Sequence, residues 1–268
     1  VDRFRHEWYS NNPSFSTRNI YRSDLIWLIA PWNWKNVKPR QLTKRKVLCS
    51  IHHIDEDKYD ILESKNFAER DEYVDQYHVI SNKTAEQVAK LTDKKITKLP
   101  FWLNTNIWFE ISEKKLLREK YNLNESDYII GSFQRDSEGH DPKKPKLSKG
   151  PDRLIEILID LKKSKKNLHV VLTGLRRDYI VNQLVKNNIK YSYFKMKDFK
   201  EINELYNCLD LYIVSSRYEG GPQAILECGV TRTPIISTDV GIASEILSST
   251  SIFDMNNFQK NTTVYNHN

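Results

Sequence analysis

Residues 209–247 read LDLYIVSSRYEGGPQAILECGVTRTPIISTDVGIASEIL and predict two strand–turn–helix units in succession. The apolar, β-branched run at 209–214 is typical of a buried parallel strand. The Gly-Gly-Pro turn at 220–222 then breaks the chain, and a helix is expected over 223–230. Pro-Ile-Ile-Ser at 234–237 predicts the next strand. Alternating strands and helices of this kind indicate an α/β protein with a parallel, Rossmann-like sheet.

Two glutamates stand on either side of the glycine turn. Glu219 precedes the glycines, and Glu227 lies on the helix that follows them. Ligands of open α/β sheets bind beyond the carboxyl ends of the strands, where both acids are expected. Carboxylates accept hydrogen bonds from ligand hydroxyls, and the bare amides of Gly220 and Gly221 suit an anionic or polyhydroxylated ligand. A helix-capping or solvated surface acid is the alternative for either glutamate alone.

This stretch resembles the donor-binding signature of retaining GT-B glycosyltransferases, the family-4-like enzymes also called group 1. The signature has two glutamates with seven residues between them, which is the spacing of Glu219 and Glu227. The frame S-R-x-E-G-x-P, which ends at Pro222, and the later run P-x-x-x-T-D-V-G, which ends at Gly241, match it as well. A weaker resemblance covers residues 24–247. It implies a GT-B fold, in which two Rossmann-like domains face a cleft.

The composition is compatible with that fold. The chain has 268 residues, enough for two modest domains, and contains no apolar run of transmembrane length. Its first residues, Val-Asp-Arg-Phe-Arg, do not resemble a signal peptide, and none is expected here. Its three cysteines lack metal-ligand spacing and are typical of reduced thiols in an intracellular protein. The net charge of +7 indicates ordinary solubility, or an affinity for phosphates or an anionic membrane surface. The basic run at 143–149 has no aromatic residue, so nucleic acid is not an expected partner.

Residues 1–105 are expected to form the N-terminal, acceptor-binding domain. Apolar runs predict strands over 24–29, 46–51 and 77–81. The segment 1–21 is polar and aromatic with turn signals, and little regular structure is expected there. The first predicted strand begins at Asp24, whereas members of the family usually have about three more strands before it. The resemblance therefore predicts an N-terminal domain that is shortened or incomplete.

His52 and His53 follow the strand expected at 46–51. Adjacent strand residues point to opposite faces, so the two histidines are poor co-ligands for a metal. The resemblance implies a histidine at this strand end that faces the donor sugar. His52 aligns with it best, His53 is the alternative, and a packing role remains open. The acidic triplet at 55–57 resembles that of metal-dependent GT-A enzymes, but a loop is expected, since a GT-B protein needs no metal or other cofactor.

Residues 106–268 are expected to form the C-terminal, donor-binding domain, after a linker near 103–110. Strands are predicted over 128–133, 168–173 and 191–194, with helices between them. A polar segment, 248–268, follows the signature. Members of the family usually continue there with helices that cross back to the first domain, and these are not expected here.

Two cations in this domain resemble the diphosphate-binding residues of the family. Arg135 matches the arginine of a Gly-Arg pair, although Gln134 replaces the glycine, and Lys149 matches a Lys-Gly pair before a helix. Two fixed cations and a helix N-terminus can neutralise a diphosphate without a metal. A solvated surface lysine is the alternative for Lys149. Residues 136–148 form a polar insertion longer than the family leads us to expect, and we expect it to be exposed.

The resemblance implies transfer of a sugar from a nucleotide diphosphate sugar to an acceptor hydroxyl, with retention at the anomeric carbon. Arg135 and Lys149 would stabilise the leaving diphosphate. Glu227 would accept from the ribose hydroxyls, while Glu219 and the turn at 220–222 hold the sugar. His52 and Glu219 are the expected catalytic residues. The set expected to bind the donor is Arg135, Lys149, Gly220, Gly221, Pro222 and Glu227.

The acceptor cannot be identified from the sequence: a glycan, a lipid-linked sugar or a protein is compatible with it. Trp32 and Trp34, at the end of the first strand, could stack on a sugar, lie at a membrane interface or simply pack. We expect a cytoplasmic enzyme of glycan, polysaccharide or glycolipid biosynthesis, with peripheral membrane contact left open. The main alternative is an inactive sugar-nucleotide-binding module or subunit of a larger glycosyltransferase, and another GT-B activity ranks last.

Overall fold

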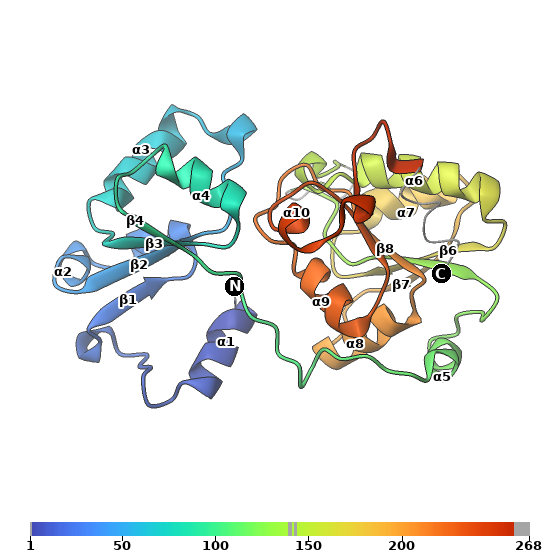
Figure 1. The fold of residues 1–268 in the computed structure, drawn as a ribbon, viewed down its shortest axis with the longest axis horizontal. Helices are drawn as coiled ribbons and strands as arrows, with labels where there is room; N and C mark the ends of the chain where they lie inside the picture. The colour runs from blue at the N-terminus through green and yellow to red at the C-terminus, as the bar shows by residue number, and fades with distance from the viewer. Residues whose placement is uncertain (1, 139–140, 142–143, 260–268) are drawn as a thin grey trace. The chain divides into compact units, whose positions relative to one another are not determined.

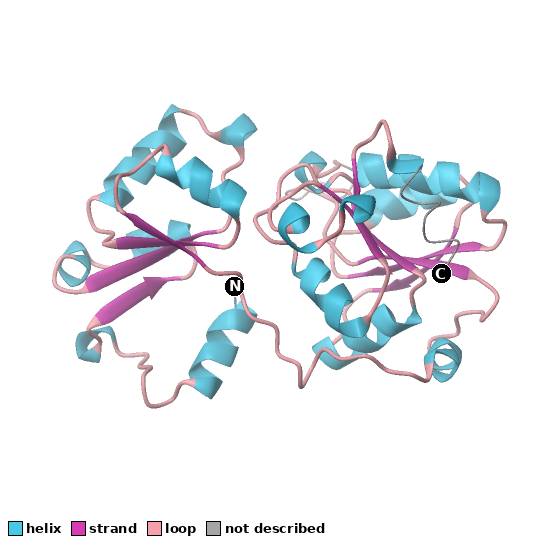
Figure 2. Cartoon of the chain, viewed as in Figure 1, coloured by secondary structure: helices cyan, strands magenta, loops and turns pink. Residues whose placement is uncertain are grey.

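The computed structural model describes residues 2–138, 141 and 144–259. The chain divides into two compact units, Val1–Phe101 and Trp102–Asn268, which we call the N-terminal unit and the C-terminal unit. Each contains one parallel β-sheet with helices packed on it (Figures 1 and 2). The structure therefore divides the chain slightly earlier than the sequence division between residues 105 and 106.

The sheet of the N-terminal unit has four parallel strands in chain order, β1-β2-β3-β4. Their bounds are β1 (Leu25–Leu28), β2 (Lys46–Ile51), β3 (Gln76–Val79) and β4 (Lys95–Lys98). The connections contain η1 (Ile20–Arg22), η2 (Pro31–Asn36), α2 (Pro39–Leu42), η3 (Glu56–Lys58), α3 (Ile61–Asp71) and α4 (Asn82–Ala89). The three strands predicted in this part of the chain are present: β2 has the predicted bounds, and the ends of β1 and β3 differ by one or two residues.

One face of this sheet is apolar because side chains alternate along each strand. Val47, Cys49 and Ile51 of β2 lie beside matching positions of β1 and β3 in the register. These residues form one buried cluster with Phe67 of α3 and Val88 of α4. The helices α3 and α4 therefore cover this face.

Helix α1 (Asp2–Asn11) corrects the expectation that the segment 1–21 lacks regular structure. Phe4 stacks on Phe101 with ring centroids 4.1 Å apart, and Trp8 meets the edge of Trp27 at 5.1 Å. Phe4 and Trp8 have the i, i+4 spacing, so both project from one side of a helix. That aromatic stripe packs against the second face of the sheet and explains why the segment is helical.

The C-terminal unit has a six-stranded parallel sheet in the order β10-β9-β8-β5-β6-β7. The strands are β5 (Tyr128–Ser132), β6 (Leu168–Thr173), β7 (Lys190–Phe194), β8 (Leu211–Val214), β9 (Ile235–Thr238) and β10 (Ile252–Phe253). Read from β7, the order along the chain is 3-2-1-4-5-6, the Rossmann order. The order reverses between β5 and β8, and open α/β sheets bind ligands at the carboxyl ends of such strands.

Helices cover both faces of this sheet (Figure 1). They are α5 (Lys114–Lys120), α6 (Pro151–Ser164), α7 (Asp178–Lys186), α8 (Phe199–Cys208), α9 (Gln223–Thr231) and α10 (Ala243–Ile246), with η4 (Leu147–Lys149) and η5 (Ser249–Ser251) as short turns. Apolar residues of α6 and α7 form one core, while α5, α8 and α9 contribute to the other. Every residue of β6 is buried, as expected of a strand covered on both faces.

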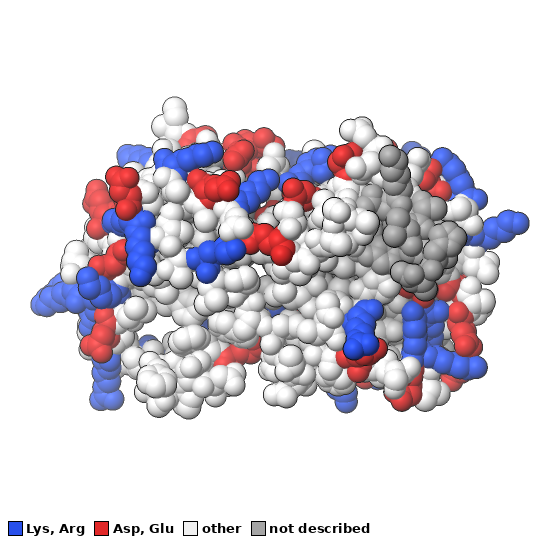
Figure 3. Space-filling view, viewed as in Figure 1, with Lys and Arg blue, Asp and Glu red and all other residues white. Residues whose placement is uncertain are grey.

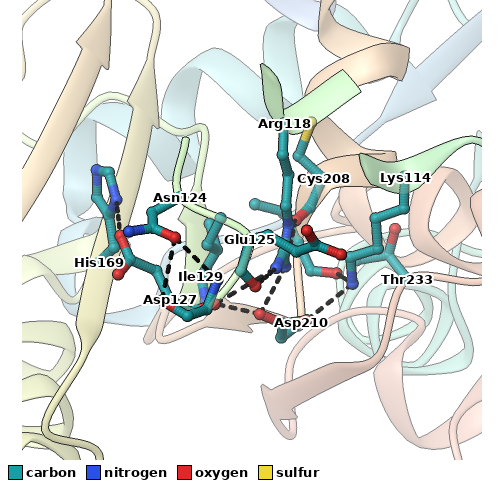
Figure 4. Close-up of polar contacts among 12 residues, drawn as sticks. Lys114, Arg118, Asn124, Glu125, Asp127, Ile129, His169, Cys208, Asp210 and Thr233 are labelled. Atoms are coloured by element: carbon teal, nitrogen blue, oxygen red, sulfur yellow. Dashed lines mark hydrogen bonds and ion pairs between the residues drawn. The ribbon is translucent and has the colours of Figure 1, made fainter. Parts of the chain in front are cut away.

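The buried Arg118 and the partly exposed Asp210 join the amino ends of β5 and β8 (Figure 4). Arg118 of α5 donates through Nε and Nη2 to the carbonyl of Cys208, at 3.0 and 2.8 Å, and pairs with Asp210 at 2.7 Å. The same Asp210 oxygen accepts from the amide of Ile129 at 2.8 Å. This cluster fixes α5 to the start of β5 and β8. It lies at the sheet edge opposite to the one where ligands of such folds bind.

Candidate functional site

Three segments meet where the strand order of the C-terminal unit reverses. Gln134, just after β5, donates from Nε2 to the carbonyl of Lys149 at 2.9 Å. Ser216, just after β8, donates from Oγ to Oε1 of Gln134 at 3.3 Å. The loops after β5 and β8 and the turn before α6 are therefore joined at the carboxyl edge of the sheet. Gln134, noted from the sequence only as a replacement for glycine, is the residue that links them.

Lys149 and Glu219 form an ion pair at this junction. The side chains are 24% and 14% exposed, so the pair is partly shielded from water. Ser216 Oγ also donates to Glu219 Oε1 at 3.1 Å. The sequence assigned Lys149 to the diphosphate and Glu219 to the sugar. The structure brings both charges to one place.

Gly150 allows this close approach. It has a φ of +61°, and a Cβ at this position would lie 1.8 Å from the carbonyl oxygen of Ser215. Ser215 Oγ donates to the Gly150 carbonyl at 2.8 Å. Only glycine can hold Lys149 this close to the loop after β8.

Arg217 fastens the same loop to the first turn of α6. Its Nη1 and Nη2 lie 2.8 and 2.6 Å from the two carboxylate oxygens of Asp152, a bidentate pair. Burial alone would raise the pKa of Asp152, but the hydrogen bonds and charge of Arg217 outweigh it and lower that pKa. Arg217 was quoted from the sequence within the signature but given no role. Its guanidinium holds the loop that carries Glu219.

The turn at 220–222 is supported by the second glycine turn. Gly241 has a φ of +55°, and a Cβ there would lie 2.1 Å from the Gly220 carbonyl oxygen. The amides of Gly220 and Gly221 donate no hydrogen bond within the part of the chain that the structure describes. Helix α9 begins directly after Pro222 and has no side-chain cap. These amides can therefore donate to an anion or a hydroxyl group.

Glu227 lies on α9 and is only 7% exposed. Its Oε2 accepts a hydrogen bond of 2.9 Å from the hydroxyl of Tyr206 on α8. Burial and the charge of Glu227 raise the pKa of Tyr206 well above its usual value, so the hydroxyl stays protonated and donates. Glu227 is therefore a positioned, largely buried acid.

Arg135 is exposed and makes no hydrogen bond or ion pair with the residues that the structure describes. The residues after it correct the expectation that 136–148 are simply exposed, because Asp136 and Ser137 are 2% and 1% exposed. Asp136 is buried because it pairs with Arg177. Residues 139, 140, 142 and 143 of that insertion lie outside the described residues.

His52 lies in the N-terminal unit, at the end of β2. Its Nε2 is 2.7 Å from the carbonyl of Ile29, so Nε2 carries the proton and donates it. The ring stacks on Phe101 at 5.4 Å and lies 6.4 Å from the ring of Trp32, which is 66% exposed. Burial lowers the pKa of His52, although the Ile29 carbonyl acts in the opposite direction. His52 is therefore a fixed, neutral imidazole near pH 7.

Three further observations concern metals, membrane spans and surface charge. Across residues 2–138, 141 and 144–259, no three His, Cys, Asp or Glu side chains are grouped so that they could hold a metal ion. No helix among these residues is both long and apolar enough to cross a bilayer. On the face shown in Figure 3, basic and acidic side chains are interspersed, and the positive charge is not gathered there into one patch.

The chain has two parallel sheets, the second in the Rossmann order, and it shares the GT-B fold of solved glycosyltransferase structures. The family model described as "Glycosyl transferases group 1" matches residues 113–259, which is more than half of the chain. The chain therefore belongs to the group 1 glycosyltransferases, as the sequence signature predicted.

Solved structures of glycosyltransferases have the same fold. HepE from Anabaena, in complex with UDP and glucose, is 14% identical with a TM-score of 0.70, and the match covers 91% of this chain and 67% of that one. Sucrose-phosphate synthase from Thermosynechococcus elongatus is 16% identical with a TM-score of 0.73, covering 97% and 70%. WaaG, a glycosyltransferase involved in lipopolysaccharide biosynthesis, is 16% identical with a TM-score of 0.62, covering 88% and 72%. A search of curated protein sequences found no match.

Proposed function

We propose that this glycosyltransferase moves a sugar from a nucleotide diphosphate sugar to an acceptor hydroxyl with retention of the anomeric configuration. The observation that carries the proposal is the group formed by Lys149, Glu219 and the turn at 220–222, beside the buried Glu227, where the strand order reverses. A cation, two acids and unbonded amides offer partners to each part of a sugar nucleotide.

The leaving group is a nucleoside diphosphate, whose negative charge grows as the bond to the sugar breaks. Lys149 and Arg135 would stabilise this charge electrostatically, together with the N-terminus of α6. Fixed cations can do this without a metal, so we propose a metal-independent enzyme. Glu227 would accept from the ribose hydroxyls, since its carboxylate is already oriented by Tyr206.

The sugar would be held by Glu219, the amides of Gly220 and Gly221, and the adjoining Pro222. His52 would approach the sugar from the N-terminal unit, with the protonated Nε2 bonded to Ile29 and Nδ1 left as its acceptor. These roles, and front-face attack with the leaving phosphate helping to deprotonate the acceptor, rest on the resemblance to retaining enzymes.

HepE and TarM have been solved with UDP, and WaaG is involved in lipopolysaccharide biosynthesis. These relatives support a UDP-sugar donor and a glycan, lipid-linked or protein acceptor in the synthesis of a glycan, polysaccharide or glycolipid. A cytoplasmic enzyme, with or without peripheral membrane contact, fits such acceptors.

Calorimetric titration with UDP, GDP and ADP in the presence of EDTA tests the donor site. We expect one nucleotide to bind to the wild type and to lose affinity by more than tenfold in Glu227→Gln, because ribose hydroxyls would lose a charged acceptor. Glu156→Gln, an exposed acid on α6, is the matched control. No binding of any of the three would refute the donor site. Anomeric analysis of the transfer product by NMR would then test retention, and binding without turnover would identify an inactive sugar-nucleotide-binding module.

A further inference from the structure

Arg177 forms a buried ion pair with Asp136 at the carboxyl end of β5. Its Nε lies 3.0 Å from Oδ2 of Asp136, and the two side chains are 0% and 3% exposed. Nη2 of Arg177 donates to the hydroxyl of Ser132, the last residue of β5, at 3.0 Å. The pair therefore ties the segment before α7 to the point where the chain leaves β5.

Backbone hydrogen bonds fix Asp136 in the same place. Its amide donates to the carbonyl of Arg176 at 3.2 Å, and its carbonyl accepts from the amide of Lys146 at 2.7 Å. The hydroxyl of Ser137 donates to Asp136 Oδ1 at 3.0 Å. Lys146 stands directly before η4, the turn that ends at Lys149. Asp136 thus connects the loop after β5 with the turn that carries the expected phosphate-binding lysine.

The residue on the other side of Arg135 is held as well. Gln134 donates to the Lys149 carbonyl at 2.9 Å and accepts from Ser216 at 3.3 Å. Arg135 therefore lies between two anchored neighbours while its own side chain is exposed. Because the backbone is fixed on both sides, the positions that the Arg135 guanidinium can reach are restricted. Gln134 bonds to Lys149 itself, and Asp136 bonds to Lys146 in the segment that leads to Lys149.

The energetics of the Asp136–Arg177 ion pair indicate that it positions the chain more than it stabilises the fold. Buried ion pairs contribute little net stability, because desolvation offsets the Coulomb attraction. Nε and Nη1 of Arg177 and Oδ2 of Asp136 are buried and make no hydrogen bond among the described residues, so the 3.0 Å contact is an ion pair without a hydrogen bond, which adds to that cost. Burial raises the pKa of Asp136 and lowers that of Arg177, although each partner's charge opposes the shift of the other. A well-packed apolar pair could stabilise the loop equally well. It would lack the attraction between opposite charges that brings Asp136 to Arg177.

We propose that Asp136 and Arg177 are positioning residues that hold Arg135 at a fixed distance from Lys149, so that both cations meet the diphosphate of one donor. Neither residue of the pair touches the donor, and both act through Arg135. The inference rests on the proposed function. It adds that recognition of the diphosphate depends on the buried pair of Asp136 and Arg177, which lies outside the signature at 209–247.

The test compares affinities for a nucleoside diphosphate and for its parent nucleoside, using whichever of UDP, GDP and ADP binds to the wild type. Asp136→Asn should weaken diphosphate binding about tenfold, the value of a lost charge-assisted contact, and leave nucleoside binding unchanged. Arg135→Ala should have the same selective effect. In the Arg135→Ala background, Asp136→Asn should cause no further loss, because both changes remove one interaction.

Asp210→Asn is the matched control, since Asp210 pairs with the buried Arg118 at the opposite edge of the same sheet (Figure 4). It should lower stability and leave the ratio of the two affinities unchanged. If Asp136→Asn does not fold, Ser132→Ala removes only the hydroxyl that holds Arg177 and should give the same selective loss. Equal weakening of diphosphate and nucleoside, or an added loss in the Arg135→Ala background, would overturn the inference. A wild type that binds none of the three nucleotides would instead overturn the proposed function.

Discussion

The ammonium of Lys149 is paired with the carboxylate of Glu219, and Ser216 donates to the same carboxylate oxygen at 3.1 Å. The cation expected to meet the donor phosphate is therefore already neutralised by the acid expected to meet the donor sugar. A diphosphate that binds here must compete with Glu219 for Lys149. Glu219 would favour the sugar and disfavour the bare diphosphate at the same site.

Glu219→Gln should consequently have opposite effects on the affinity for the bare diphosphate and on the affinity for the sugar nucleotide. We expect affinity for the nucleoside diphosphate to rise about two- to fivefold, since a partly exposed pair contributes below about 1 kcal/mol. Affinity for the matching sugar nucleotide should fall, because a charged acceptor for its hydroxyls is lost. Calorimetry with both ligands measures the two changes, with Glu156→Gln as a control on an exposed acid. Weaker binding of the bare diphosphate would show that the pair supports the phosphate site and does not compete with it.

Gly241 should tolerate no side chain. A Cβ at this position would lie 2.1 Å from the carbonyl oxygen of Gly220, and the φ of +55° is unfavourable for alanine. Gly241→Ala should lower the free energy of unfolding by roughly 2 kcal/mol and displace the turn at 220–222, with loss of donor affinity. Denaturant unfolding and calorimetry measure these effects.

Gly229 provides the control for that change. It lies within α9, and a Cβ there would meet nothing within 4 Å. Gly229→Ala should raise the free energy of unfolding by up to about 1 kcal/mol, because alanine favours the helix. If both substitutions have the same effect on donor affinity, the contact between Gly241 and Gly220 does not support the site.

Much of the fold follows from local pattern. The predicted strands are short apolar runs rich in β-branched residues, and all of them are present in the two sheets within a few residues. Helix α1 was not predicted because its segment is polar and lies before an Asn-Asn-Pro turn. The spacing of Phe4 and Trp8 was the sequence signal for this helix. It can be interpreted only once Phe101 is known to pack against Phe4.

The pairing of charges could not be predicted in the same way. Glu219 and Lys149 were found separately, each from its short motif, but they are distant in the sequence and nothing local specifies their contact. Asp136 and Arg177 carried no motif at all. Which loops meet depends on the strand order. The reversal of that order between β5 and β8 is seen only in the folded sheet.

The N-terminal unit should lose stability as the pH falls below about 6.5, the ordinary pKa of histidine. Burial lowers the pKa of both His52 and His78, although the carbonyls of Ile29 and Leu99 act in the opposite direction. The unfolded chain then binds protons before the folded one does, so stability present above the unfolded pKa is lost on acidification. His78→Gln should reduce this dependence.

Amide hydrogen exchange of β2 and β3 between pH 8 and 5, corrected for intrinsic rates, measures that loss in this unit alone. A whole-chain melting curve would also include His169 of the C-terminal unit, whose pKa burial lowers as well. An unchanged pH slope in His78→Gln would show that His78 does not contribute to it.

Tyr206→Phe should impair recognition of ribose without removing any proposed donor ligand. The hydroxyl of Tyr206 donates to Glu227 at 2.9 Å, and its loss should cost about 1 kcal/mol of stability. Glu227 would then be less well oriented, so a ribonucleoside diphosphate should lose affinity severalfold. Its preference over the 2′-deoxy and 3′-deoxy analogues should shrink, since that preference reports the contact with the ribose hydroxyls.

Tyr121→Phe is the control for this substitution. Tyr121 donates to Glu204 at 2.6 Å, so this change removes the same kind of tyrosine–glutamate hydrogen bond from the same unit. It should lower stability by a similar amount and leave both affinity and the preference for ribose unchanged. Calorimetric titration of the two variants with the ribose and deoxyribose ligands separates the outcomes. A preference for ribose that survives in Tyr206→Phe would mean that Glu227 does not need Tyr206, or that it does not bind the ribose.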